Sequence, residues 1–204
     1  MTPAEPLADT RARILDEALK LFAEKGFAGL SMDRLARELG VTKQAVLHHF
    51  GSKQKLYAAV LESISERLLT DIVENQQLDS EATDSAFVRS VLKIYEHTMA
   101  FRDETCLLMR ELLDNPERAS QAGTWYLRPF LDRLHSQLRQ SAPWAAADES
   151  RIATHVYQVL GAIHYFPVSL TTLRNMYSPA VVDDMIKQYP EQLRQLAGLE
   201  SKGG

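Results

Sequence analysis

The sequence has a single cysteine, Cys106, and only nine glycines among its 204 residues. One cysteine excludes an intrachain disulfide. Charged residues interrupt every apolar run well before the roughly 18 residues that a membrane helix needs. No apolar segment precedes the first charged helix, so we expect no secretory signal. These absences predict a cytoplasmic protein that does not enter the membrane.

Patterns of a metal centre or an enzyme are also missing. His97, Cys106, His155 and His164 are nine or more residues apart, whereas a metal-binding helix usually presents ligands at i, i+3 or i+4. No glycine-rich phosphate loop, nucleophile elbow or suggestive acid pair is present. We therefore predict no metal, no cofactor and no catalytic residue, and we assign these side chains to packing.

Hydrophobic residues make up 45% of the chain, which is enough for a sizeable core. They recur at helical spacing, and no segment alternates with period two for long enough to form a strand. The sequence therefore predicts an all-α protein of about nine or ten helices. Three sets of helix boundaries are expected: a cap at Asp9 or Thr10 with closure at Gly26, a long helix from Ser52 to Gln76, and a helix from Asp148 to near Pro167.

Residues 31 to 50 predict two short helices joined by a tight turn. Gly40 can end the first helix in the left-handed conformation, and Thr42 can cap the second. Both helices have an apolar stripe, formed by Leu35, Ala36 and Leu39 on the first and by Val46 and Phe50 on the second. This spacing is typical of a helix-turn-helix.

The outward face of the second helix carries Lys43, Gln44, Leu47 and His48. Donors, acceptors and one apolar group suit a helix that reads base edges in a major groove. A solvated helix face has a similar composition, so the context matters. Ser31 can cap the first helix at an end that would meet a backbone phosphate of DNA. Ser52, Lys53 and Lys55 follow the second helix, where a third helix would start. This context favours DNA binding.

At these residues the chain resembles the TetR family of bacterial transcriptional regulators. The matching positions are Arg13-Ile14-Leu15, Ala18-Leu19-x-Leu21-Phe22-x-Glu24-Lys25-Gly26-Phe27, Leu30-Ser31-Met32, Leu35-Ala36-x-x-Leu39-Gly40-Val41-Thr42-Lys43 and His49-Phe50-x-Ser52-Lys53-x-x-Leu56. They cover roughly the first third of the chain. Gln44 replaces the usual Gly or Ala, and Leu47 replaces the usual Tyr, so we expect an unusual operator sequence.

The resemblance implies a homodimeric regulator, most simply a repressor, that binds a palindromic double-stranded DNA operator and responds to an unknown small-molecule effector. It also implies that His49 and Lys53 hold operator phosphates. The complete set of expected DNA-binding residues is Ser31, Met32, Lys43, Gln44, Ala45, Leu47, His48, His49 and Lys53.

The chain is expected to have two domains. Residues 1–51 form the helix-turn-helix domain, in which residues 1–9 are a mobile arm, and residues 52–204 form a helical ligand-binding and dimerisation domain. Residues 1–57 carry nine basic against seven acidic side chains, and the rest carry 14 against 20. The excess of positive charge therefore coincides with the motif, although the asymmetry is modest.

Dimerisation is expected through the last two long helices, because their stripes contain more apolar residues than packing within one helical sandwich requires. The expected interface residues are Ile152, Val156, Val159, Leu160, Ile163, Val182, Ile186 and Tyr189. Gly161 would allow close approach. The expected effector residues combine apolar walls with polar anchors. They are Tyr95, Met99, Met109, Arg110, Trp125, Tyr126, Phe130 and His155.

Two alternatives stay open from the sequence. The chain could be an all-α enzyme, or a helical adaptor that binds only protein, with an accidental helix-turn-helix pattern. A saturable, sequence-specific gel shift distinguishes a DNA-binding regulator from both.

Overall fold

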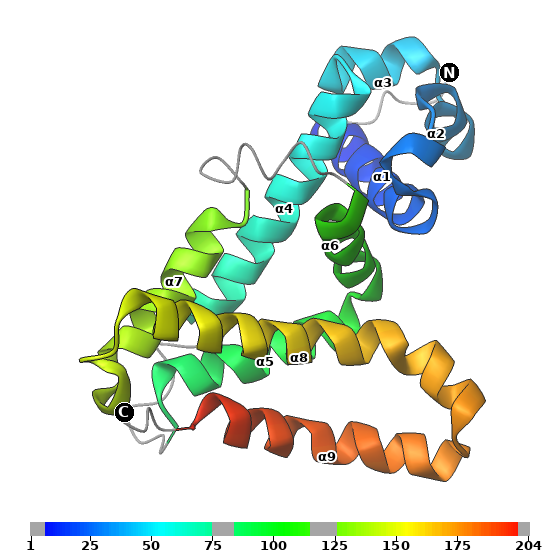
Figure 1. The fold of residues 1–204 in the computed structure, drawn as a ribbon. Coiled ribbons are helices and arrows are strands. Elements are labelled where there is room, and N and C mark those ends of the chain that lie inside the picture. Colours follow the sequence, from blue (N-terminus) through cyan, green and yellow to red (C-terminus); the bar gives the residue numbers. More distant parts are fainter. Residues whose placement is uncertain (1–6, 75–83, 115–125, 200–204) are drawn as a thin grey trace. The chain divides into compact units, whose positions relative to one another are not determined.

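The computed structural model describes residues 7–74, 84–114 and 126–199, and every regular element in these ranges is helical (Figure 1). The prediction of an all-α fold is therefore confirmed. The elements are α1 (Leu7–Gly29), α2 (Met32–Leu39), α3 (Lys43–Phe50), α4 (Lys53–Glu74), α5 (Ala86–Ala100), α6 (Arg102–Asp114), α7 (Arg128–Gln140), the short 3-10 helix η2 (Ala142–Trp144), α8 (Glu149–Met176) and α9 (Pro179–Ala197).

These elements form two compact units. Unit 1 comprises Met1–Ser65 and Cys106–Tyr126, and unit 2 comprises Glu66–Thr105 and Leu127–Gly204. The division falls inside α4 and inside α6, so each of these helices contributes residues to both units. The predicted domain boundary after residue 51 lies at the start of α4 and stays a prediction.

In unit 1, α2 packs against both α1 and α3. Most of the apolar stripe expected on α2 and α3 is buried, because one face of each helix is covered by its neighbours, while Leu39 is partly buried. Ile14, Phe22, Leu35, Val46 and Leu56 are among its buried side chains. Helices α1, α2 and α3 and the start of α4 thus share one small core.

The start of α1 corrects the sequence prediction. Helix α1 begins at Leu7, so residues 7–9 belong to its first turn and not to a mobile arm, and the expected cap at Asp9 or Thr10 is wrong. Residues 1–6 lie outside the described residues. At the other end the helical geometry breaks at Gly26, as expected, where φ is 71° and ψ is 173°. That positive φ is accessible to glycine at little steric cost.

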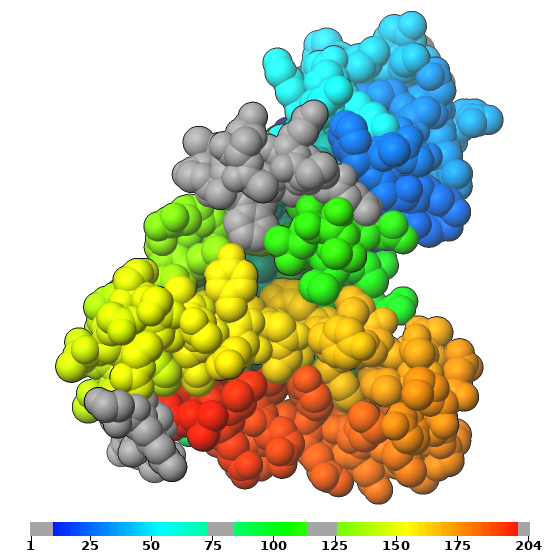
Figure 2. Space-filling model, viewed as in Figure 1, coloured from blue at the N-terminus to red at the C-terminus, as the bar shows by residue number. Residues whose placement is uncertain are grey.

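In unit 2, α5, α8 and α9 pack against one another, and α7 packs against α5 and α8. Figure 2 shows α8 and α9 side by side on one face of this unit. Ser85 and Asp148 cap α5 and α8 through side-chain oxygens that accept backbone N–H groups. The cap predicted at Asp148 is therefore confirmed.

The predicted end of α8 near Pro167 is wrong, because the helix continues to Met176. Proline has no N–H to donate to the carbonyl of Ile163 and crowds the preceding turn. Ile163, Phe166 and Pro167 are nevertheless buried. Burial against neighbouring helices stabilises α8 across the missing hydrogen bond. No helix in the described ranges is long and apolar enough to cross a membrane.

Candidate nucleic-acid interface

The turn between α2 and α3 is built from local caps. The Ser31 hydroxyl accepts the Arg34 N–H at 3.2 Å, and the Thr42 hydroxyl accepts the Ala45 N–H at 3.1 Å. Gly40 ends α2 in the left-handed conformation, with φ 68° and ψ 26°. These three predicted features are confirmed. They fix where α3 begins and therefore which of its side chains face outward.

Helix α3 has one buried and one exposed face. Val46 and Phe50 are buried, whereas Lys43, Gln44 and His48 are exposed. The exposed side chains present an ammonium, an amide and an imidazole at helical spacing, which are groups that can hydrogen bond with base edges or phosphates. Ala45, Leu47 and His49 are partly buried at the border of this face.

Two predicted DNA-binding residues have less accessible side chains than expected. Met32 is 8% exposed and packs in the core of unit 1, so its side chain offers little surface to DNA, whereas its backbone at the start of α2 is suited to a phosphate. Lys53 is partly buried, and its ammonium lies 4.4 Å from the centre of the Phe27 ring. Burial lowers the pKa of Lys53 from its ordinary value.

A carboxylate that the spacing of the sequence did not reveal lies beside the exposed face of α3. The Lys43 ammonium lies 2.8 Å from Asp33 Oδ2 in the first turn of α2. Hydrogen bonding to Lys43 lowers the pKa of Asp33. Residue spacing did not reveal this pair, because Asp33 and Lys43 are ten residues apart and meet only through the packing of α2 against α3.

The expected effector residues divide between the two units. Tyr95, Met99, Phe130 and His155 belong to unit 2, whereas Met109, Arg110 and Tyr126 belong to unit 1. Trp125 lies outside the described residues. Arg110 donates to the Glu24 carbonyl at 3.4 Å in unit 1, so the expected role as an anchor for the effector has no support from its position. Periodicity identified apolar side chains but not which helices share a core.

Two of these residues lie in aromatic clusters of unit 2. The Tyr95 ring stacks on Tyr189, with centroids 5.5 Å apart, and Tyr189 stacks on Phe166 at 3.9 Å. Burial raises the pKa of Tyr95 to about 12. Its buried hydroxyl has no hydrogen-bond partner among the described residues. A buried hydroxyl without a hydrogen-bond partner lowers the stability of the fold unless another molecule accepts its hydrogen bond.

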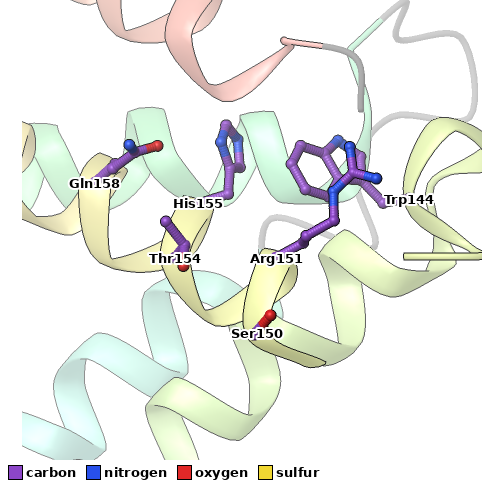
Figure 3. A pocket seen from close by; sticks show the side chains of 6 residues that line it. All are labelled: Trp144, Ser150, Arg151, Thr154, His155 and Gln158. Atoms are coloured by element: carbon purple, nitrogen blue, oxygen red, sulfur yellow. The ribbon is translucent and has the colours of Figure 1, made fainter. Parts of the chain in front are cut away.

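The other cluster borders a shallow pocket of about 240 Å³ near the start of α8 (Figure 3). His155 stacks on Trp144, with ring centroids 4.5 Å apart. The pocket is lined by Trp144, Ser150, Arg151, Thr154, His155 and Gln158. His155 alone was expected from the sequence, because nothing in the spacing of the chain places η2 beside α8. Among the described residues, no three His, Cys, Asp or Glu side chains are grouped as metal ligands.

The expected dimer interface is largely inside the protomer. Ile152, Val156, Val159, Ile163 and Val182 are each at most 1% exposed. They pack α8 and α9 against the core of unit 2 and expose almost no surface on the protomer, and the dimer interface itself stays a prediction. Leu160, Ile186 and Tyr189 are partly buried, and the Tyr189 hydroxyl donates to the Ala162 carbonyl at 2.8 Å.

Another face of α8 is exposed and aromatic. Tyr157 and Tyr165 are 61% and 69% exposed and lie two turns apart. Gly161 lies between them in the sequence, and apart from its chain neighbours and the backbone of its own helix no atom lies within 4 Å of the position that a β-carbon would take there. The close approach expected at Gly161 therefore does not occur within the protomer. We call Tyr157, Gly161 and Tyr165 the outer face of α8.

Comparison with known proteins agrees with this architecture. Residues 14–60 match the family described as "Bacterial regulatory proteins, tetR family". The "HTH-type transcriptional repressor AcnR" of Corynebacterium efficiens is 33% identical over 89 residues, which are 40% of this chain and 47% of that protein. The "HTH-type transcriptional regulator SrpR" of Pseudomonas putida is 30% identical over 133 residues, 65% of this chain and 61% of that protein. The match thus spans about half the length of these curated relatives.

The likeness in structure extends further along the chain. The crystal structure of a TetR-family transcriptional regulator from Bordetella parapertussis superposes with a TM-score of 0.69 at 21% sequence identity. The superposition covers 93% of this chain and 94% of that one. At this identity the likeness establishes the fold of the C-terminal helices and nothing about what they bind.

Proposed function

The chain belongs to the TetR family of transcriptional regulators, and we propose that it is a repressor that binds a palindromic DNA operator as a homodimer and responds to a small molecule. The exposed face of α3 carries this proposal. Gln44 and His48 would read base edges, while Lys43, His49 and Lys53 would hold phosphates. A DNA-binding regulator acts at the chromosome, which agrees with the predicted cytoplasmic location.

The start of α2 supports the same orientation on DNA. The exposed Ser31 hydroxyl accepts from the Arg34 N–H, and the first N–H groups of α2 lie at the positive end of the helix dipole. This end can receive a backbone phosphate. Contacts of this kind would set the register of α3 along the groove without contributing sequence information.

Dimerisation is proposed through the outer face of α8 and the adjoining end of α9. Two heads must read half-sites about 34 to 36 Å apart, and a two-fold symmetric dimer provides this spacing. Tyr157 and Tyr165 expose large apolar surface, and Gly161 leaves space for a helix of the second copy. Met176, Tyr177 and Val181 continue the exposed apolar surface at the connection between α8 and α9.

The effector is proposed to bind in unit 2, at the cluster of Tyr95, Phe166 and Tyr189. Its rings would favour a largely apolar molecule, and the buried Tyr95 hydroxyl could donate to one oxygen of that molecule. The molecule would shift operator affinity only by binding more tightly to the conformation that is unsuited to the operator. A screen by thermal shift of hydrophobic acids, phenols and cationic drugs, followed by gel shift, tests this part.

The DNA-binding proposal is tested by selecting duplexes from a random library with the purified full chain. We expect recovery of a palindromic motif and a saturable shift that unrelated DNA does not compete away. The binding constant should fall with salt, with a slope of about −0.9 per neutralised phosphate, summed over two heads. Recovery of no motif, or a binding curve that is the same for every duplex, would contradict the proposal.

A further inference from the structure

A line of contacts inside unit 1 joins a carboxylate of α6 to Lys53. The Tyr57 hydroxyl of α4 donates to Glu111 Oε2 at 2.5 Å. The Tyr57 ring meets the Phe27 ring edge-on, with centroids 5.0 Å apart, and the Lys53 ammonium lies 4.4 Å from the centre of the Phe27 ring. Three contacts thus connect four side chains from α6, α4 and the end of α1.

The Glu111 end of this line is buried. Glu111 is 2% exposed and Tyr57 is 7% exposed, so their hydrogen bond is shielded from water. A short bond from a hydroxyl to a carboxylate is stronger than a bond between neutral groups, and it fixes the rotation of the phenol. The same phenol also meets Phe22 edge-on, with centroids 4.8 Å apart. Tyr57 is therefore held at its hydroxyl and along its ring.

At the other end, this line of contacts restrains the long side chain of Lys53. A lysine loses much rotamer entropy when it binds a phosphate, and prior packing of its stem reduces that cost. The Phe27 ring holds the ammonium by a cation–π contact near the start of α4. The orientation of Phe27 depends in turn on the Tyr57 ring, which packs against it.

We propose that Glu111 and Tyr57 are positioning residues for operator binding, which act through Phe27 on the ammonium of Lys53. The proposal rests on the proposed function, in which Lys53 binds a phosphate of the operator. Helix α6 would thereby control how well Lys53 meets the DNA backbone, although neither Glu111 nor Tyr57 touches DNA.

Helix α6 contributes residues to each of the two units and makes side-chain contacts within each. Within unit 1, Arg110 of α6 donates to the Glu24 carbonyl of α1 at 3.4 Å. Within unit 2, Glu104 in the first turn of α6 bonds to His97 and Arg67.

The test is a double-mutant cycle on binding to the duplex that the wild-type chain selects from a random library, measured by fluorescence anisotropy at fixed salt. Tyr57→Phe removes the hydroxyl and keeps the ring. We expect it to weaken binding about three- to tenfold in the wild-type background and less than twofold in the Lys53→Gln background, because interacting residues are not additive. Glu111→Gln, which keeps the shape of the side chain, should show the same dependence on Lys53.

Controls separate this effect from a general loss of structure. Ser63→Ala removes a hydroxyl that also donates one hydrogen bond from α4, to the Val60 carbonyl, and should leave operator binding unchanged in both backgrounds. Thermal unfolding identifies any variant that fails to fold, and Glu111→Gln replaces Tyr57→Phe if the latter does. Equal losses in both backgrounds, or no loss in either, would overturn the positioning role. A wild-type chain that selects no duplex would instead overturn the proposed function.

Discussion

The Nε2 atom of His97 lies 2.9 Å from Glu104 Oε2, and both side chains are buried. The other ring nitrogen, Nδ1, lies 2.6 Å from Asp71 Oδ2, and the second Glu104 oxygen lies 2.7 Å from an Arg67 guanidinium nitrogen. Carboxylates accept hydrogen bonds and do not donate them, so the imidazole must donate from both nitrogens. His97 is therefore a buried cation that connects α4, α5 and α6 within unit 2.

This arrangement predicts that stability falls as the pH rises. Burial lowers the pKa of His97, but hydrogen bonds and charge from Glu104 and Asp71 outweigh burial and raise the pKa above its ordinary value of 6.5. A raised pKa gives stability that is fully present below about pH 6.5 and is lost as the pH rises through the folded-state pKa. Urea unfolding of the wild type, measured from about pH 6.5 to about pH 9, checks this sign.

The variant His97→Gln isolates this contribution. Removing one partner of a buried charge cluster costs about 3 kcal/mol, so we expect a loss of that order near pH 6.5 and a smaller loss at higher pH. His155 and His164 titrate in the opposite sense, because burial lowers the pKa of each, and their protonation below about pH 6.5 destabilises the fold. A difference between variant and wild type that does not change with pH would contradict the assignment of His97 as a cation.

Removal of the Asp33 carboxylate should strengthen DNA binding. Asp33 pairs with Lys43 beside the exposed face of α3, so its charge both occupies the lysine and repels phosphates. We expect Asp33→Asn to tighten binding to the selected duplex severalfold at low salt, with less effect at high salt because salt screens these charges. Since an exposed ion pair contributes little to stability, the unfolding midpoint should barely move.

Variants in α3 and at the start of α4 should distinguish residues that read the base sequence from residues that only strengthen binding to any DNA. Gln44→Ala or His48→Ala should each cost about 1 to 3 kcal/mol on the selected duplex and relax the base preference at one position of each half-site. Lys53→Ala should instead weaken binding to all duplexes by a similar factor and reduce the slope of affinity against salt. Parallel selections with the three variants distinguish these outcomes. An unchanged motif with Gln44→Ala and His48→Ala would place the reading face elsewhere.

Charges on the outer face of α8 should disrupt the proposed dimer without unfolding the protomer. Tyr157→Glu combined with Tyr165→Glu places two carboxylates where a second copy would pack, and burial of unpaired charges is unfavourable. We expect sedimentation of a monomer with native circular dichroism. Tyr126→Glu, at another exposed tyrosine, is the matched control and should stay dimeric.

Charge at the buried stripe of the same helix should have a different effect. Val159 is 1% exposed and packs inside unit 2, so Val159→Glu should unfold the protomer and not merely separate two copies. The two sets of variants therefore distinguish the interior of unit 2 from its outer face. A folded, dimeric double variant at Tyr157 and Tyr165 would exclude this face as the interface.

The local features of the head were predictable from the sequence. The caps at Ser31 and Thr42 act over three residues, and Gly40 ends α2 through its own backbone conformation. Interactions this short depend on neighbours along the chain, so residue type and spacing were sufficient to place them. The same was true of the exposed position of Gln44 and His48, which follows from helical periodicity once the start of α3 is fixed.

Only the tertiary structure decided which apolar residues face the protomer's own core. Helix α8 has Val159 on one side and Tyr157 and Tyr165 on another, and periodicity alone did not show which side packs against α5 and α9. The continuation of α8 through Pro167 likewise depends on burial, because local propensity favours an end there. Tyr57 and Glu111 are 54 residues apart, and their contact requires a fold that places α6 beside α4 in unit 1. Side-chain partners of this kind follow from packing between distant segments, which residue type and spacing do not encode individually.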